Sequence, residues 1–324
     1  MTAELADLAN PVAKIAYVAL FAAAIVLWWL CSAHPAILPF WAPWDFSWVE
    51  FLSAWFAIVW YIRGLSLVGA DCRPSPARRA AFFVGVLLIY SVLETHFEYF
   101  AEHQFFYNRI QHVVMHHLGP LLIALAWPGE VLWYGSPAFM RRIVAHRFVI
   151  GIVRSLQQPV LAVFLFSGSF FFWLIPSVHF RAMVDPNLYS LMNWTMVADG
   201  LLFWCLLLDP RPAPPARVSF GTRIALAFVV MPPQIVGGSI IALSSHDLYS
   251  FYSLCGRIYP QLSAGTDQAI GGLIIWIPPA MMSVAAALFI LNNIRLVEDR
   301  STDKWIDEEN NGCWVVDSSQ WTGR

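Results

Sequence analysis

The sequence is short of charge. Asp, Glu, Lys and Arg make up 12% of its 324 residues, whereas a soluble domain averages about 25%. It contains no basic tract, which argues against nucleic acid as a partner. Its five cysteines are scattered without a CxxC pair, so a thiolate metal site has little support. Because the sequence shows no nucleotide-binding loop and no nucleophile–base pair, we expect a protein that is not an enzyme.

Long hydrophobic runs are what the sequence has instead, and 59% of its residues are hydrophobic. About 20 residues, rising about 1.5 Å each, are needed to cross about 30 Å of hydrocarbon. Helices are the only open structure that satisfies its own backbone hydrogen bonds in lipid. We therefore predict an all-α, polytopic transmembrane helix bundle embedded in the lipid bilayer. Its eight predicted spans are Ala13–Cys31, Val49–Val68, Ala80–Phe97, Arg109–Trp127, Gln158–Ile175, Leu188–Leu208, Thr222–Leu243 and Gln268–Ile294.

Positive charge is distributed unevenly between the loops. If the N-terminus is inside, nearly all of the 19 Lys and Arg lie in inner segments, and the outer segments hold only Arg109, Arg181 and Arg257. Because cytoplasmic loops carry an excess of Lys and Arg, this asymmetry predicts an N-in, C-in topology. We expect one integral membrane domain over residues 1–297 and a polar cytoplasmic tail over residues 298–324.

Two inner connections have a distinctive composition. In Pro128–Gln157, arginines are interleaved with apolar residues. This pattern is typical of an amphipathic helix on the inner membrane surface, and a cytoplasmic extension of the fifth span explains it equally well. The segment Asp209–Arg217 is too rich in proline for a helix and is expected to be a stiff link.

The nine histidines lie almost entirely on one side of this topology. Only His146 falls on the inner side, although the orientation rests on Lys and Arg alone. The outer half carries His34, His96, His103, His112, His116, His117, His179 and His246. Of these, the isolated His34, His179 and His246 are expected to be ordinary hydrogen-bonded groups. The remaining five histidines fall in one short stretch, which is where a functional site is expected.

The tightest part of that stretch is the beginning of the fourth span. His112 and His116 are four residues apart, so they share one face of a helix, and two imidazoles so placed can share one metal ion. His117 points about 100° away in a regular helix, and Met115 flanks the pair. Ionisable residues inside a membrane span are costly and tend to be functional. We predict that His112 and His116 bind a metal near the outer water boundary, with Met115 and His117 as further ligands.

The outer end of the third span adds carboxylates and two more imidazoles. Glu94 and Glu98 are one turn apart, and His96 and His103 lie close to them in the sequence. A short outer loop joins the third and fourth spans, so the two helix ends are expected to be neighbours. We predict that His96 and His103 are entry or transfer ligands and that Glu94 and Glu98 support the metal ligands.

Two further spans contain polar groups. Asp267 and Gln268 open the eighth span, ahead of Gly271 and Gly272. An acidic residue at this position suits a helix N-terminus, and it suits equally well the task of fixing an imidazole N–H beside a metal. Asp199 lies in the middle of the sixth span and is expected to make a polar contact within the bundle.

The donor types leave the metal open. Imidazole suits Zn, Cu, Fe and Ni, whereas thioether sulphur adds a preference for Cu(I). Met115 supplies one thioether, and Met192 and Met196 lie one turn apart on the sixth span, although ordinary packing also explains those two. The carboxylates at the outer end of the third span, with Glu102, would suit a harder ion.

Two motifs resemble a known family. The run His112-Val-Val-Met-His116 with Gly119-Pro120-Leu-Leu, and the run Asp267-Gln268-Ala-Ile-Gly271-Gly272-Leu-Ile-Ile-Trp276-Ile-Pro278, resemble the bacterial cytochrome c oxidase assembly factor family of the CtaG type. The resemblance covers about residues 80–295, and the second motif is the more specific because HxxxH alone is common. Val113 stands where a Met often follows the first His, and Met115 replaces a commonly polar position.

This resemblance implies a multi-pass protein of the bacterial inner membrane that is needed to make active terminal oxidase. Carried over residue by residue, it marks His112, His116, Asp267 and Gln268. We expect a membrane-embedded, copper-binding assembly factor, or chaperone. It would deliver copper, as Cu(I), to a cytochrome c oxidase subunit or another cuproprotein at the extracytoplasmic face. A second copy of the chain is a further candidate partner.

Other functions fit parts of the same pattern. A copper transporter resembling the copper resistance protein D family would have a similar number of spans. A histidine-box membrane metalloenzyme would contain strings such as HxxxHH, but such enzymes have several boxes on the cytoplasmic side, and this sequence has one on the predicted outer side. A haem-binding electron carrier would need paired histidines on separate helices.

Overall fold

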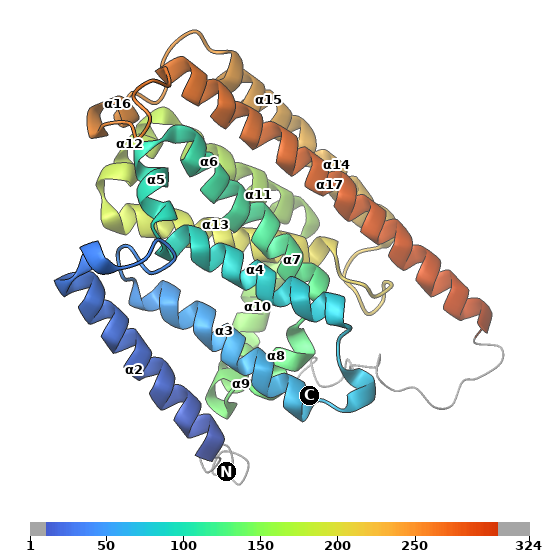
Figure 1. Cartoon of the computed structure of the whole chain (residues 1–324). Coiled ribbons are helices and arrows are strands. Elements are labelled where there is room, and N and C mark those ends of the chain that lie inside the picture. Colours follow the sequence, from blue (N-terminus) through green and yellow to red (C-terminus); the bar gives the residue numbers. More distant parts are fainter. Residues whose placement is uncertain (1–10, 304–324) are drawn as a thin grey trace.

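The fold is entirely helical, as predicted, in a computed structural model that describes residues 11–303 (Figure 1). No β-strand occurs in this range. The predicted polar tail lies outside the described residues from residue 304 onward, and the last helix runs to Asp303. The helices are α2 Pro11–Ala33, η1 Pro35–Ile37, α3 Trp48–Leu67, η2 Ala70–Cys72, α4 Pro76–Glu94, α5 Phe97–His103, α6 Phe105–Val113, η3 Val114–Leu118, α7 Gly119–Ala126, α8 Gly129–Gly135, α9 Ala138–Val144, α10 Arg147–Leu156, α11 Pro159–Leu174, α12 Pro176–Val184, α13 Pro186–Leu207, α14 Phe220–Val229, α15 Met231–Leu243, α16 Phe251–Cys255 and α17 Ala264–Asp303.

Fewer helices than predicted have the length and apolar composition of a membrane span. Within the described residues, five single helices pass this test, and two bent helix pairs raise the number to seven. The predicted span Val49–Val68 is present as the 20-residue helix α3. It is less apolar than the others because it contains Glu50 and Arg63 among several Trp and Tyr residues. The expected count of eight is therefore corrected to five to seven, with α3 a full-length but less apolar member of the bundle.

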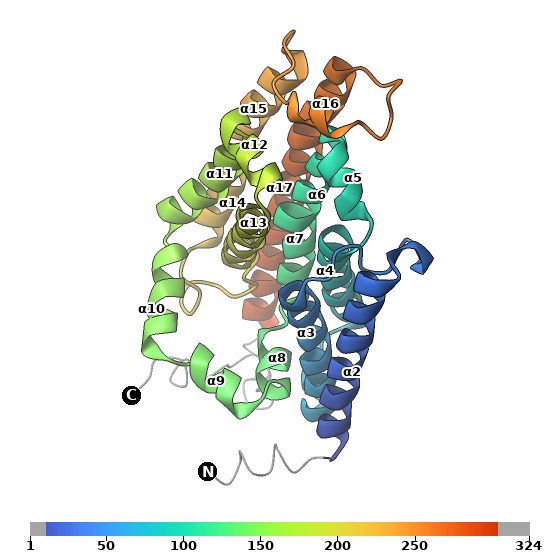
Figure 2. The ribbon, with the colours of Figure 1, turned by 90° about the vertical axis from the view of Figure 1, so that its left-hand side faces the viewer.

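The long helices lie side by side, and their connections alternate between the two ends of the bundle (Figures 1 and 2). The short helices α5, α12 and α16 gather at one end, which we call the histidine end because His96, His103 and His179 lie in these connections. The helices α8, α9 and α10 lie at the opposite end, as do the start of α2 and the finish of α17. This arrangement agrees with the predicted alternation of loops, and the predicted orientation in the membrane stays a prediction.

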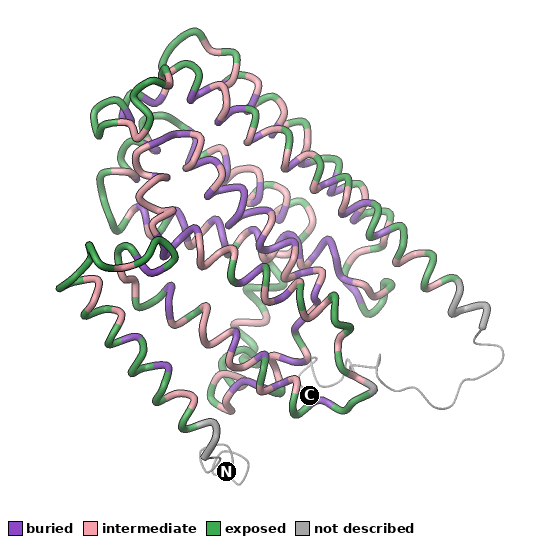
Figure 3. Tube along the Cα trace, in the orientation of Figure 1, coloured by how far each residue is buried: buried purple, intermediate pink, exposed green. Residues whose placement is uncertain are grey.

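Apolar side chains line both the inside and the outside of the bundle, as expected for a protein dissolved in lipid. The central helices bury their side chains, whereas peripheral helices are exposed along most of their length (Figure 3). In α2, for example, Ile15 and Val18 are 67% and 69% exposed. In water, such a surface would be an unfavourable apolar patch.

The inner connection between residues 128 and 157 forms three short helices. The last of them, α10, meets α11 at a bend of 75°, so it does not continue the axis of that span. Phe148 is 69% exposed on α10, and Arg147 and Arg154 lie at its two ends. This geometry favours a helix lying along the membrane surface over an extension of the fifth span.

The proline-rich connection 209–217 contains no helix, in agreement with the sequence. The buried guanidinium of Arg223 holds it in place by donating hydrogen bonds to three carbonyls, those of Asp209, Arg211 and Val218. Three backbone oxygens thus accept from the two terminal nitrogens of this cation, near the start of α14.

Close backbone approach between α3 and α8 depends on glycine. A Cβ atom at Gly135 would lie 1.7 Å from the carbonyl oxygen of Trp60, whereas nothing lies within 4 Å of a Cβ at Gly168. Small residues of this kind allow helices in membranes to pack closely.

We expect Gly135→Ala to lower the free energy of unfolding by about 1–3 kcal/mol, because the added methyl must push the two helices apart. Gly168→Ala is the matched control and should leave stability unchanged or slightly raised. Thermal unfolding of the purified protein in detergent measures both. Equal melting temperatures for Gly135→Ala and the wild type would contradict the packing described for α3 and α8.

Candidate metal centre

The three consecutive helices α6, η3 and α7 form one continuous span with a π-turn in its middle. The π-turn covers Val114–Leu118, which includes Met115, His116 and His117. Its cause is Pro120, which has no N–H to donate to the carbonyl of His116 and whose ring crowds that carbonyl. The His116 carbonyl instead accepts a hydrogen bond from the indole Nε1 of Trp204 at 3.3 Å. A widened turn is therefore built into the sequence at the histidines.

Helix α13 approaches this turn closely because of Gly200. A Cβ atom there would lie 2.4 Å from the His116 carbonyl oxygen. The missing side chain brings the polar residues of α13, including Asp199, next to the π-turn.

His116 and His117 form the central pair of the centre. Their Nδ1 atoms lie 3.1 Å apart, and their ring centroids are separated by 4.5 Å. Although the rings touch, the two side chains meet different helices, His116 facing Asp199 on α13 and His117 facing Gln234 on α15. The close imidazole pair is His116–His117 rather than His112–His116.

The pair is the middle of a chain of polar contacts between four elements. The amide Nε2 of Gln234 on α15 lies 3.0 Å from His117 Nε2. At the other end, His116 Nε2 lies 3.0 Å from Asp199 Oδ1 on α13, and Ser169 on α11 donates to the other oxygen of Asp199. The sequence of contacts is therefore Gln234, His117, His116, Asp199 and Ser169.

The order of contacts bears on the proton positions. With the Gln234 amide donating to His117 Nε2, a neutral His117 carries its proton on Nδ1 and donates it to His116 Nδ1. His116 Nε2 then faces the Asp199 carboxylate at 3.0 Å, in ion-pair contact and without an aligned hydrogen bond. Histidine binds metals as the neutral imidazole.

Aromatic rings enclose the pair. Phe166 stacks on His116 with a centroid distance of 4.2 Å and an interplanar angle of 21°, and Phe170 and Trp204 lie around both rings. His116 and His117 are fully buried. The two rings thus lie inside the bundle, because α11, α13 and α15 all cover the turn, and their predicted position near the outer water boundary stays a prediction.

His112 lies on α6, just before the π-turn, and is 1% exposed. Neither of its ring nitrogens has a hydrogen-bond partner among the described residues. Arg109, one turn earlier, is also fully buried, with Nε and Nη1 unpartnered and Nη2 donating to Asn108. Buried polar groups in native proteins are nearly always paired, so two free imidazole nitrogens point to a missing partner at this position.

Thioether sulphur is also present around the centre. Met115, Met192 and Met196 are fully buried members of one side-chain cluster. The Sδ atom of Met196 lies 3.8 Å from Ser169 Oγ, the hydroxyl that holds Asp199. The centre therefore combines imidazoles with soft sulphur donors in a region without water access.

The other predicted ligands lie apart from this centre, toward the histidine end of the bundle. His96 packs against Phe40 and Trp44, and His103 contacts the Tyr99 carbonyl through Nδ1 at 2.8 Å. Glu94 is fully buried and accepts a hydrogen bond from the Ser47 backbone N–H at 3.2 Å. Within the described part of the chain, no hydrogen bond or ion pair joins these groups to the π-turn, so their roles as transfer or supporting residues stay predictions.

Asp267 and Gln268 organise the histidine end of the bundle. The Asp267 carboxylate accepts hydrogen bonds from the backbone N–H groups of Phe105 and Phe106, at 3.1 and 2.9 Å, and pairs with Arg257. It thus caps α6, the helix that carries His112, from a different helix. Gln268 bonds the Leu248 N–H and the carbonyls of Ile241 and His246, and so ties the end of α15 to α17. Neither side chain contacts an imidazole among the described residues.

A metal between the two close imidazoles requires a small opening. Metal–nitrogen distances of about 2.0 Å place two ligand nitrogens up to about 4 Å apart, more than the 3.1 Å that separates the two Nδ1 atoms. Within the described part of the chain, no three His, Cys, Asp or Glu side chains are spaced to hold an ion directly. The imidazole and thioether donors suit a soft ion. In this structure, however, the two imidazoles are hydrogen-bonded to each other and leave no room for an ion between them.

Sequence reasoning missed several residues that shape the centre. Gln234 and Ser169 complete the polar chain. His179 is hydrogen-bonded, as expected, with Nε2 2.9 Å from the Tyr252 hydroxyl, but it is also buried. Polar residues inside apolar spans were the available signal, and only Asp199 was marked by it. Their meeting in space depends on which helix faces pack together, which spacing along one chain segment does not reveal.

The Asp267 cap gives a test of how α6 is held. We expect Asp267→Asn to lower the free energy of unfolding by about 1.5–3 kcal/mol, because it removes the charge that strengthens these bonds to two N–H groups and one guanidinium. Asp247→Asn is the control, because Asp247 lies 4.0 Å from the same Arg257 in a more exposed position. If thermal unfolding shows equal losses for both variants, Asp267 does not have the special role assigned to it.

Comparison with known proteins bears on the whole bundle. No curated protein and no solved structure matches the chain. The model of one family, described as cytochrome c oxidase caa3 assembly factor, matches residues 57–295. The match covers most of the chain, including the π-turn, α13, α15 and the Asp267 cap. The chain therefore belongs to the cytochrome c oxidase caa3 assembly factor family.

Proposed function

We propose that this protein binds a copper ion at the π-turn and hands it, by ligand exchange, to cytochrome c oxidase or another cuproprotein at the extracytoplasmic face. Family membership supports a role in the assembly of cytochrome c oxidase. The observation that carries the copper proposal is His112, a fully buried imidazole whose two nitrogens lack hydrogen-bond partners among the described residues, one turn before the His116–His117 pair. An ion bound among these rings would supply the partner that His112 lacks.

The donor types around the centre favour a soft monovalent ion. Arg109 is a buried cation one turn from His112 and Asp199 is a carboxylate beside His116, so the nearby charges are of both signs. Imidazole and thioether donors suit Cu(I). We therefore propose Cu(I) as the bound form, in preference to Zn(II) or Cu(II).

Release of the ion requires a change in the bundle. The rings are enclosed by Phe166, Phe170 and Trp204, so no ligand of a partner protein reaches them in the arrangement described. His96 and His103 lie toward the histidine end, where an outgoing ion would next meet imidazole. We propose that they act as transfer ligands after the π-turn opens.

Elemental analysis of the purified, copper-loaded protein tests the binding site. We expect about one copper per chain, and loss of most of it in His112→Asn combined with His116→Asn, because two imidazole donors are removed. His34→Ala combined with His246→Ala is the control, since both of these residues are exposed. Unchanged copper content in the double Asn variant would remove the π-turn as the binding site.

The Asp199 carboxylate tests whether the polar chain supports binding. Replacing the side chain that contacts a metal-binding histidine typically lowers the affinity for the metal by about 10–100-fold. We expect Asp199→Asn to weaken Cu(I) binding by such a factor, measured by competition with a Cu(I) chelator, while the protein stays folded. In cells lacking their own copy, the same variant should restore less cytochrome c oxidase activity than the wild type. Wild-type affinity in this variant would contradict the role of Asp199.

A copper transporter is the second candidate, and the burial of the centre inside the bundle is the observation that favours it. A site that can be reached from either side is commonly enclosed in the middle of a transporter. Uptake of copper into vesicles containing the purified protein separates the two functions. An assembly factor that only hands over its ion should show copper binding without net accumulation.

A further inference from the structure

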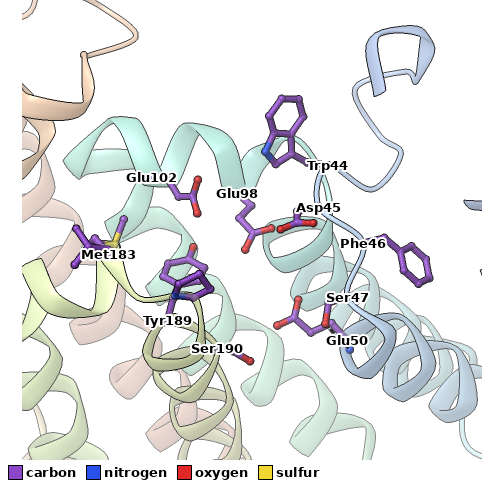
Figure 4. A pocket seen from close by; sticks show the side chains of 12 residues that line it. Trp44, Asp45, Phe46, Ser47, Glu50, Glu98, Glu102, Met183, Tyr189 and Ser190 are labelled. Atoms are coloured by element: carbon purple, nitrogen blue, oxygen red, sulfur yellow. Dashed lines mark hydrogen bonds between the residues drawn. The ribbon is translucent and has the colours of Figure 1, made fainter. Parts of the chain in front are cut away.

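A second polar site lies between α3, α5 and α13, at the histidine end of the bundle and apart from the π-turn. It is a cavity of about 260 Å³. Its lining includes four carboxylates, from Asp45 and Glu50 on one side and from Glu98 and Glu102 on the other. Figure 4 shows the side chains of Glu50, Glu98 and Glu102 directed toward the same space. The rest of the lining is mainly aromatic and small polar, including Trp44 and Tyr189.

Glu50 distinguishes this cavity from an ordinary acidic surface. Its side chain is 8% exposed and points into the cavity. Among the described residues it accepts no hydrogen bond through its carboxylate and pairs with no cation. An ionised carboxylate that is largely removed from bulk water and has no cationic partner is disfavoured, and a bound cation would offset that cost. The same absence of Lys and Arg partners within the described residues applies to Asp45, Glu98 and Glu102.

We propose that this cavity binds a divalent cation of the Mg²⁺ type, held largely through its coordinated water. Carboxylate oxygens are the ligands that such hard ions prefer. Within the described part of the chain, no three acidic or histidine side chains are spaced to chelate one ion directly. Mg²⁺ gives up its water reluctantly and is commonly held by few protein ligands, so a water-filled cavity ringed by carboxylates suits it.

The electrostatics of the cavity agree with this assignment. Glu50, Glu98 and Glu102 face the same cavity, so their ionised forms repel one another. A dication among these groups would stabilise their ionised forms and remove the repulsion. Trp44 and Tyr189 would remain as a partly apolar wall.

The site is distinct from the proposed copper centre in both place and chemistry. Asp45 and Glu50 precede residue 57, where the match to the assembly factor family begins. The donors here are hard oxygens, whereas the π-turn offers imidazole and sulphur. The inference therefore does not depend on copper binding, and each proposal can fail without the other.

Mn²⁺ is a suitable probe, because it shares the oxygen preference of Mg²⁺ and its free form is counted by electron paramagnetic resonance. We expect the purified full-length protein to bind one Mn²⁺ per chain and to release it when Mg²⁺ is added. Glu50→Gln should weaken binding at least tenfold, and Glu98→Gln combined with Glu102→Gln should weaken it further. Glu130→Gln, at the opposite end of the bundle, is the matched control and should bind as the wild type does.

Two further measurements distinguish loss of cation binding from loss of folding, and the cavity from the proposed copper centre. Mg²⁺ should raise the melting temperature of the wild type but not that of Glu50→Gln, which shows whether the variant is folded and merely unable to bind. The double variant His112→Asn with His116→Asn should keep its Mn²⁺ site. The proposal is overturned if the wild type binds no Mn²⁺ at millimolar concentration, or if Glu50→Gln binds it with wild-type affinity.

Discussion

The structure depends on one constraint, which is the missing hydrogen bond at Pro120. Because proline cannot donate to the carbonyl of His116, the span widens into a π-turn and that carbonyl is free to accept from Trp204. The widened turn places the rings of His116 and His117 in contact. Gly200 then allows α13 to approach the turn, so that Asp199 meets His116. The polar chain through the bundle follows from these local features.

Burial determines the chemistry of this series of polar contacts between Gln234 and Asp199. Phe166 and Trp204 enclose the rings, so the buried ring nitrogens depend on contacts with Gln234, with each other and with Asp199. Neutral imidazoles near methionine sulphur are suited to a soft ion. The protein surrounds this centre with lipid-facing helices and fixes the start of the histidine-bearing helix through the distant Asp267. Stability and proposed chemistry thus share the same few contacts.

The sequence allowed the class of fold to be predicted because hydrophobic length and charge asymmetry are strong, additive signals. It also marked the histidine-bearing segment and the family. It did not reveal the pairing of His116 with His117, because an α-helical spacing was assumed across a turn that Pro120 widens. It overcounted the spans at α3, where apolar length is diluted by Glu50 and Arg63. Gln234 and Ser169 could be seen as polar residues in apolar spans, but not as neighbours, since packing decides that.

The central claim is that buried imidazoles of the π-turn bind Cu(I). It is supported by membership of the assembly factor family and by the donors present at this turn. X-ray absorption at the copper edge of the loaded, purified protein tests this claim most directly, because it reports the atoms bound to the metal. We predict a reduced copper with imidazole nitrogen ligands and a contribution from sulphur, and a weaker imidazole signal when His116 is replaced. Copper coordinated only by oxygen, or an identical spectrum without His116, would contradict the account.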